Sequence, residues 1–146
     1  MFSLRHVGVT VTDMDSALRL YQQYFKFEVV WDQIEEGPFI DGLSAIPNIK
    51  VRTVKMKDKS SPVMLELLQY ISHPKNNEEN KKNAITNIGC SHFAITVKDL
   101  EKTFTDLSSM GLIFNKKPCI SPDGNAKVAF CRDFDGTLLE LVEQIS

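Results

Sequence analysis

A repeat divides this sequence into two similar halves. The segment HVGVTVTDMDSAL at 6–18 returns as HFAITVKDLEKTF at 92–104, and MLELLQ at 64–69 returns as LLELVE at 138–143. Such a repeat indicates two copies of one structural unit. With 146 residues, the chain has the size of one domain with internal pseudo-symmetry, and two copies are too few for a solenoid.

The same order of elements is predicted in both halves. Each half begins with the alternating pattern of a strand, at 6–11 and 92–97, and continues with an amphipathic helix that Asp13 or Asp99 caps. Three further strands are predicted in each half, at 28–33, 50–57 and 63–70 and at 114–120, 127–132 and 138–143. We therefore predict an α+β fold, with a single domain 1–146 made of two modules at about 1–72 and 88–146.

Two segments have no place in the repeat. Residues 73–87 are polar without an apolar period, so they are predicted to be a solvated linker in which His73 is an exposed loop residue and not a ligand. Residues 37–48, GPFIDGLSAIPN, mix apolar and turn residues. This second segment is predicted to be either a packed cover or a mobile lid over a pocket, with a slight preference for the lid.

Charge and composition exclude several kinds of partner. Seventeen Lys and Arg against nineteen Asp and Glu give a net charge of −2, so no positive excess favours nucleic acid or an anionic membrane. No basic and apolar leader or bilayer-spanning run is visible, and we expect a soluble, cytoplasmic protein. The odd count of three cysteines without CxxC spacing suits reduced thiols, and we assign them no chemistry.

The repeat also aligns four residues that hydrophobic packing would not select. His6 aligns with His92, and Glu66 aligns with Glu140 inside apolar strand sequence. A half-buried carboxylate costs several kcal/mol unless it is paired, protonated or bound to a cation. Taken singly, each residue is better explained by exposure on an edge strand or by a cross-strand ion pair. Together, two imidazoles and two carboxylates favour one divalent metal ion: Zn, Ni, Co, Mn or Fe.

These motifs, together with FCRDFDGTLLELVE near the end of the chain, resemble the vicinal oxygen chelate superfamily. That superfamily includes glyoxalase I, methylmalonyl-CoA epimerase, extradiol dioxygenases and the bleomycin and fosfomycin resistance proteins. The resemblance implies paired βαβββ modules whose curved mixed sheets form a cleft around a metal. It also implies that the metal ligands are His6, Glu66, His92 and Glu140.

The resemblance further implies a mechanism and an assembly. The metal chelates a small-molecule substrate through adjacent oxygens and stabilises an oxyanion, while a metal-bound glutamate transfers a proton. We expect Glu140 to be this catalytic base, with Glu66 as its symmetric rival. Because members of the superfamily build the cleft within one chain or between chains, a homodimer is expected.

Three functions are compatible with these residues. The first is a metal-dependent, glyoxalase-like lyase or isomerase that catalyses proton transfer. The second is an Fe(II)-dependent extradiol-type dioxygenase. The metal ligands of such enzymes resemble the triad of His6, His92 and Glu140, but they generally have no ligand where Glu66 stands. The third is a small-molecule binding or resistance protein without a metal. LELLQYISHP lacks the asparagine and glycine expected of a glutathione-binding glyoxalase I.

Overall fold

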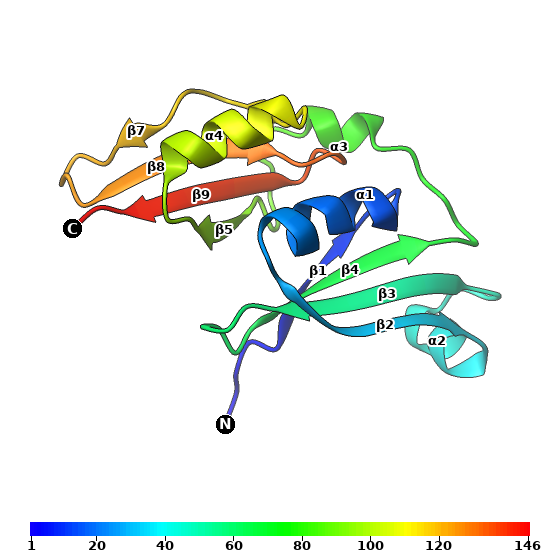
Figure 1. Cartoon of the computed structure of the whole chain (residues 1–146). Coiled ribbons are helices and arrows are strands. Elements are labelled where there is room, and N and C mark those ends of the chain that lie inside the picture. Colours follow the sequence, from blue (N-terminus) through cyan, green and yellow to red (C-terminus); the bar gives the residue numbers. More distant parts are fainter. The chain divides into compact units, whose positions relative to one another are not determined.

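A computed structural model describes all 146 residues of the chain (Figure 1). The chain divides into two units, 1–76 and 77–146. Unit 1 contains, in order, β1 (His6–Thr10), α1 (Met14–Leu18), the π-helix η1 (Arg19–Tyr24), β2 (Glu28–Glu36), α2 (Pro38–Ser44), β3 (Lys50–Lys57) and β4 (Met64–Tyr70). Unit 2 contains α3 (Glu78–Lys82), β5 (Phe93–Thr96), α4 (Leu100–Ser109), β6 (Ile113–Phe114), β7 (Cys119–Ile120), β8 (Ala126–Arg132) and β9 (Leu138–Gln144).

The two sheets have equivalent topology. In unit 1 the strand order is β1-β4-β3-β2, and in unit 2 it is β5-β9-β8-β6, with β7 also paired to β8. The first and last strands of each unit pair in parallel, whereas the remaining pairs are antiparallel. This arrangement confirms the predicted α+β fold of two βαβββ modules.

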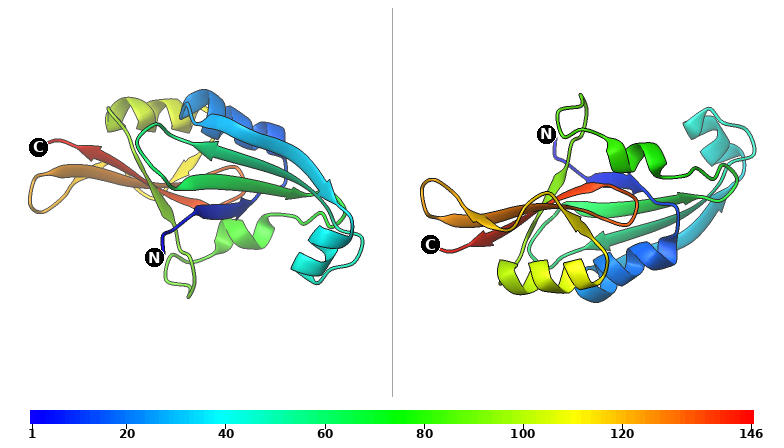
Figure 2. Two further views of the ribbon diagram at one scale, coloured as in Figure 1. Left: turned by 90° about the horizontal axis from the view of Figure 1, so that it is seen from below. Right: turned by 90° about the horizontal axis from the view of Figure 1, so that it is seen from above.

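The helix of each unit covers one face of its own sheet (Figure 2). Alternate side chains of β4, Leu65 and Leu67, are buried on this face, and the first helix contributes the fully buried Met14. In unit 2 the corresponding strand β9 buries Leu139 and Leu141. Because strand side chains alternate between faces, the glutamate between each pair of leucines points to the opposite face.

Aspartates begin both main helices, as the sequence predicts. The Ser16 backbone N–H donates to Asp13 Oδ2 at 3.3 Å, and the Lys102 N–H donates to Asp99 Oδ1 at 2.9 Å. The helices end differently. Gly111 follows the second helix with φ of 94°, whereas Lys26 takes the left-handed conformation in the first half with φ of 64°. A non-glycine residue therefore performs the same turn at some cost in backbone strain.

Several predicted boundaries change in the structure. The single strand predicted at 114–120 is instead two short strands, β6 and β7, separated by Asn115–Pro118. Pro118 has no backbone N–H to donate to a neighbouring strand, which explains a break at this point. Strand β2 extends to Glu36, beyond its predicted end. None of the helices has the length and apolar composition needed to cross a bilayer.

Part of the predicted linker is ordered against unit 2. Residues 73–87 are largely exposed, as predicted, and so is His73, but they include helix α3. Asn77 Nδ2 donates to Asp135 Oδ1 at 2.9 Å, and Asn80 Nδ2 donates to the Asp135 carbonyl at 2.7 Å. Polar side chains attach this helix to the turn before β9, so no apolar pattern in the sequence indicated it.

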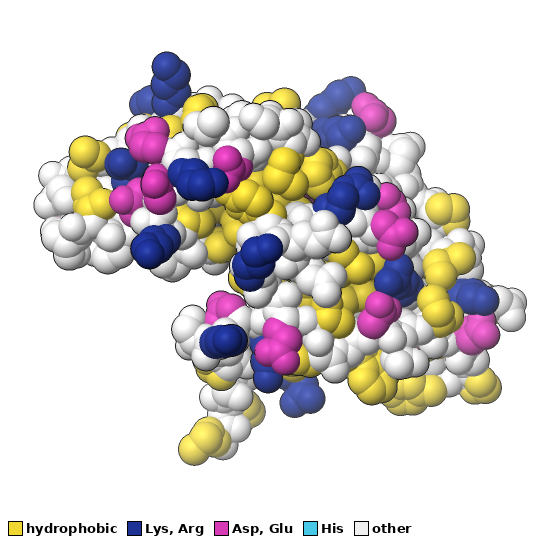
Figure 3. Space-filling view, viewed as in Figure 1, with side chains coloured by type: hydrophobic (Ala, Val, Ile, Leu, Met, Phe, Trp, Pro, Cys, Tyr) yellow, Lys and Arg dark blue, Asp and Glu magenta, His cyan; other side chains and the backbone are white.

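The segment 37–48 contains helix α2, which extends from the end of β2 (Figure 1). No residue of α2 is buried, and the side chains of Phe39 and Leu43 are largely exposed. Figure 3 shows apolar side chains on the surface in this region. The Asp41 carboxylate accepts hydrogen bonds from the backbone N–H groups of Asn48 and Ile49, which closes the loop. The segment is thus not a packed cover of its own unit, and the lid remains a prediction.

Candidate functional site

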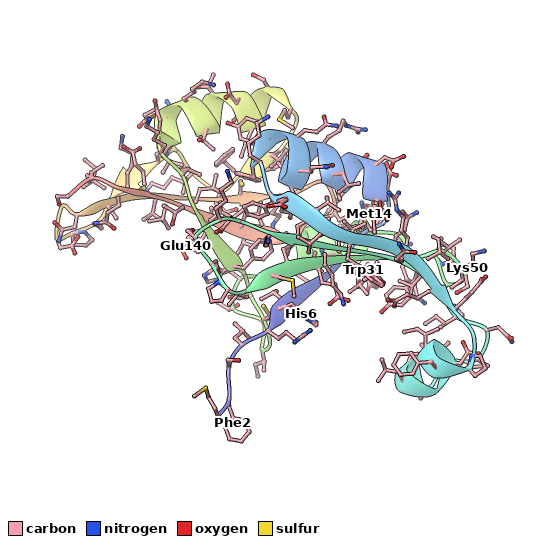
Figure 4. All side chains as sticks on the ribbon, turned by 60° about the horizontal axis from the view of Figure 1, so that its bottom comes forward. Phe2, His6, Met14, Trp31, Lys50 and Glu140 are labelled. Atoms are coloured by element: carbon pink, nitrogen blue, oxygen red, sulfur yellow. The ribbon has the colours of Figure 1, made fainter.

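The first candidate pair lies on the face of the unit 1 sheet opposite its helix. His6 begins β1, labelled in Figure 4, and Glu66 lies in the middle of the neighbouring strand β4. Their side chains meet, with His6 Nε2 at 2.8 Å from Glu66 Oε2. Gly8 is the direct neighbour of Glu66 in the register. Gly8 has no side chain, and a Cβ at its position would contact Leu68 Cδ1 at 3.4 Å.

The second candidate pair occupies the equivalent place in unit 2. The strand predicted at 92–97 begins one residue later in the structure, so His92 directly precedes β5. His92 Nε2 lies 3.2 Å from Glu140 Oε2 on β9. Ala94 is the direct register neighbour of Glu140, as Gly8 is of Glu66. The repeat in the sequence therefore corresponds to a repeated pairing of one imidazole with one carboxylate.

The ring of His92 is held from two sides. Ser91 Oγ lies 2.6 Å from His92 Nδ1, and the Phe130 ring meets the imidazole edge to face at 5.1 Å between centroids. When the Nδ1 N–H donates to the Ser91 hydroxyl, Nε2 has a free lone pair that faces Glu140. A partner of this kind orients a metal-binding histidine. At the position of Ser91 the first half has Arg5, so the two halves differ in this contact.

Glu66 carries the clearest sign of a missing partner. Its Oε2 is shielded from solvent and accepts no hydrogen bond, since the contact with His6 Nε2 meets the distance of a hydrogen bond but not its geometry. A buried carboxylate oxygen without a partner costs free energy. A cation bound by His6 and Glu66 would remove this cost, and nitrogen and oxygen donors of this kind suit a divalent metal.

Each unit alone supplies only part of a metal site. No three His, Cys, Asp or Glu side chains gather in an arrangement that could hold an ion. Zinc and similar metals take three or four protein ligands. The structure brings His6 to Glu66 and His92 to Glu140, and the sharing of one ion by all four residues remains a prediction.

The model of the Glyoxalase/Bleomycin resistance protein/Dioxygenase superfamily matches residues 3–141. The chain belongs to this superfamily. The match includes both βαβββ units and both His–Glu pairs, and it confirms the resemblance that the motifs indicated.

Similar proteins include a lactoylglutathione lyase from Schizosaccharomyces pombe, with 28% identity over 98% of this chain and 48% of the relative. The chain thus spans about half the length of this curated relative. A glyoxalase-family protein from Bacillus cereus has a similar fold, with a TM-score of 0.89 and 15% identity, covering 100% of this chain and 96% of that one. The trypanothione-dependent glyoxalase I of Leishmania major gives a TM-score of 0.66 and 20% identity, covering 98% and 87%.

Sequence reasoning missed the neighbours of the pairs. Ser91 and Phe130 contact His92, and Lys55 is the direct register neighbour of Glu66 on β3. The adjacency of Ser91 to His92 was visible in the sequence, but a hydrogen bond to the ring depends on the side-chain rotamers. The places of Lys55 and Phe130 depend on the strand register, which a sequence alone does not give.

Proposed function

We propose that the chain is a divalent-metal-dependent lyase or isomerase of the glyoxalase type, which transfers a proton on a small substrate chelated through adjacent oxygens. The observation that carries this proposal is the repeated His–Glu pair, with a buried oxygen of Glu66 that accepts no hydrogen bond. Membership of the superfamily and the lyase relative support the same reaction class.

The ligands would be His6, Glu66, His92 and Glu140, two imidazole nitrogens and two carboxylates. When bound, the metal would supply Lewis-acid stabilisation of the negative charge that develops on the substrate oxygens. The mixed nitrogen and oxygen donors suit Zn, Ni, Co, Mn or Fe. The direct strand neighbours of the two carboxylates, Gly8 and Ala94, are small residues, which limits the side chain that a substrate would meet there.

Glu140 is the better placed general base. Its side chain is 26% exposed and lies 3.2 Å from its histidine, whereas the side chain of Glu66 is 13% exposed and lies 2.8 Å from its histidine. A carboxylate with more room can leave its partner and accept a proton from the substrate. Glu66, with a shielded oxygen, is the better fixed ligand, so the two glutamates would divide the roles of base and anchor.

The iron-dependent dioxygenase is the alternative within the same superfamily. It needs only His6, His92 and one carboxylate, and so it gives Glu66 no role. The burial of Glu66 Oε2 against His6 Nε2 favours the four-ligand reaction over the three-ligand one.

The test combines metal analysis with a proton-transfer assay. Protein purified without a chelator is expected to hold about one divalent ion per chain. The metal-loaded protein should exchange the C–H protons of hydroxyacetone, a small compound with adjacent oxygens, for deuterium in D₂O, as followed by NMR. Glu140→Gln should slow this exchange by roughly 100-fold or more, because the base is lost.

A matched control is available on the same strand. Glu143 lies on the opposite face of β9, where it accepts the Leu100 backbone N–H at 2.7 Å, and Glu143→Gln keeps an acceptor oxygen there. This variant should retain the exchange rate. Protein without a bound ion, or exchange unaffected by Glu140→Gln, would contradict the proposal. Full metal occupancy in Glu66→Ala, with activity that requires Fe(II) and oxygen, would replace it by the dioxygenase.

A further inference from the structure

One row of side chains crosses the sheet of unit 1 beside the His6–Glu66 pair. Gly8 on β1 neighbours Glu66 on β4, Glu66 neighbours Lys55 on β3, and Lys55 neighbours Trp31 on β2. Side chains directly opposite each other in a sheet point to the same face, with Cβ atoms about 5 Å apart. Lys55 and Trp31 therefore lie on the same face as Glu66, opposite the helix of the unit. Figure 4 shows Trp31 and His6 on opposite edge strands of this sheet.

The ammonium group of Lys55 has no carboxylate partner. Glu66, the acidic residue directly opposite, turns to His6 instead. Lys55 Nζ lies over the Trp31 ring, 5.7 Å from its centroid. Other lysines on strands of the chain form ion pairs, such as Lys50 with Glu36 and Lys127 with Glu143. Lys55 is half-buried, so its free positive charge raises the local potential beside the candidate metal ligand.

Trp31 restricts where this charge lies. The indole is 46% exposed, although a large aromatic residue usually gains stability from burial. The cation–π contact holds the long lysine side chain near the indole and reduces the conformational entropy that an incoming anion would have to remove. The result is a fixed cation beside an open apolar ring.

The second unit does not repeat this feature. At the register position of Lys55 it has Phe130, which neighbours Glu140 and packs against His92. The two units therefore have candidate ligands of the same type at equivalent positions, but the next residue along the row differs. The row therefore carries a positive charge beside the carboxylate in unit 1 and an apolar ring beside the carboxylate in unit 2.

We propose that Lys55 and Trp31 form a subsite for a carboxylate of the substrate. This inference rests on the proposed function and specifies its substrate class: a small compound with two adjacent chelating oxygens and a second anionic group roughly 5 Å from them, the spacing of cross-strand neighbours. Lys55 donates hydrogen bonds to the carboxylate, and the Trp31 ring contacts the carbon chain that joins the two groups.

The test uses two five-carbon probes that have the same chelating 2-oxo acid group. 2-Oxoglutarate carries the distal carboxylate and 2-oxopentanoate lacks it. In the Zn²⁺-loaded protein the ratio of their dissociation constants, measured by calorimetry, should favour 2-oxoglutarate by roughly fivefold. Lys55→Met should remove this preference and leave the affinity for 2-oxopentanoate unchanged, whereas Lys55→Arg should preserve it.

Two controls separate the subsite from a general charge effect. Lys50→Met removes the same charge from the same strand, at a lysine paired with Glu36, and should leave the preference intact. Trp31 is the one tryptophan of the chain, so its emission reports on the subsite directly. 2-Oxoglutarate should change this emission more than 2-oxopentanoate does, and this difference between the probes should be absent in Lys55→Met.

The two proposals fail in distinguishable ways. If both probes bind to the metal-loaded protein and Lys55→Met keeps the preference, the subsite is wrong and the proposed function stands. If the wild-type protein holds no metal and binds neither probe, the proposed function fails. An equal loss of preference in Lys50→Met would assign the effect to net charge and would also overturn the subsite.

Discussion

At the scale of single residues, the decisive contacts are those that surround two imidazole rings. His92 has Ser91 on one nitrogen and Glu140 on the other, and Phe130 limits its rotation. A ring held in this way presents Nε2 in one direction without further loss of conformational entropy. Ser91 therefore acts as a positioning residue for the candidate ligand.

The first prediction concerns this serine. Ser91→Ala should weaken Zn²⁺ binding by roughly 10-fold, because the ring loses the partner that fixes its orientation. The dissociation constant can be measured by competition with a chelator of known affinity. Ser72 provides a matched control, since its Oγ lies 2.7 Å from His73 Nδ1 in an exposed loop. Equal losses in Ser91→Ala and Ser72→Ala would contradict this role.

The four candidate ligands could be predicted from the sequence because the repeat aligns them and the strand pattern makes them unusual. The pairing of each histidine with its glutamate agrees with that reasoning. Lys55 could not be predicted in the same way. Its place beside Glu66 depends on the β3–β4 register, and a shift of one residue would turn it to the other face of the sheet.

The cysteines also behave as their sequence context indicated. Cys90 and Cys119 are exposed and free, whereas Cys131 is buried on β8. Burial, with a smaller contribution from Asp133, raises the pKa of the Cys131 thiol to about 12. The buried thiol is therefore protonated at neutral pH, and it is a packing residue and not a nucleophile.

At the scale of elements, the attachment of α3 to the β8–β9 turn organises unit 2. The turn has Gly136 at φ of 86°, and a Cβ at this position would lie 2.6 Å from Lys81 Cα. Arg132 Nη1 donates to the Gly136 carbonyl at 2.8 Å, and its Nη2 donates to the Asn83 carbonyl. The turn before the glutamate strand β9 is thus fixed by contacts with a segment that precedes β5.

The second prediction follows from this close approach. Gly136→Ala should lower the free energy of unfolding by roughly 3 kcal/mol, because backbone strain is joined by a clash with the backbone of α3. Chemical denaturation measures this change. Gly124 has a similar φ of 76° with no atom within 4 Å of an added Cβ. Gly124→Ala should therefore cost only about 1 kcal/mol, and equal costs would argue against the clash.

Elements with a strong apolar period were predictable, and those held by polar contacts were not. Strand β3 has the predicted limits 50–57, and both aspartate caps are in place. Helix α3 carries no apolar face, so its hydrogen bonds to Asp135 gave no pattern in the sequence. The π-helix η1 continues α1 with a bond from the Phe25 N–H to the Leu20 carbonyl, and a change of helical period of this kind has no simple signal in residue types.

At the scale of the whole molecule, each of two units contributes one His–Glu pair. If one ion binds both pairs, binding must stabilise the chain only when both pairs are intact. An ion at about 100 times its dissociation constant adds about 2.7 kcal/mol to the free energy of unfolding. If the chain is instead a metal-free binding protein, the two pairs should contribute nothing to a metal-dependent increase in the free energy of unfolding.

The third prediction uses this linkage. Zn²⁺ should raise the melting temperature of the wild-type chain, and either His6→Ala or His92→Ala should abolish the increase, as measured by calorimetric unfolding. If each pair bound its own ion, each variant would retain about half of the free-energy gain. A variant at the exposed His73 should respond like the wild type.

Mixing the two variants tests the expected homodimer. When a shared ion lies between pairs of different chains, a dimer of one His6→Ala chain with one His92→Ala chain has one complete site. Co-refolding the two variants should then restore part of the Zn²⁺ binding. When both pairs of one chain share the ion, no mixture recovers binding.

The parallel pairing of β1 with β4, and of β5 with β9, has a consequence for the order of events during synthesis. Each donor pair joins the opening strand of a unit to its closing strand, so neither pair exists until the ribosome has released nearly all of that unit. A truncated or stalled chain would carry its histidine without the matching carboxylate. Under the proposed function, an ion shared by the two pairs would bind only after both units are complete, so unfinished chains would lack this stabilisation.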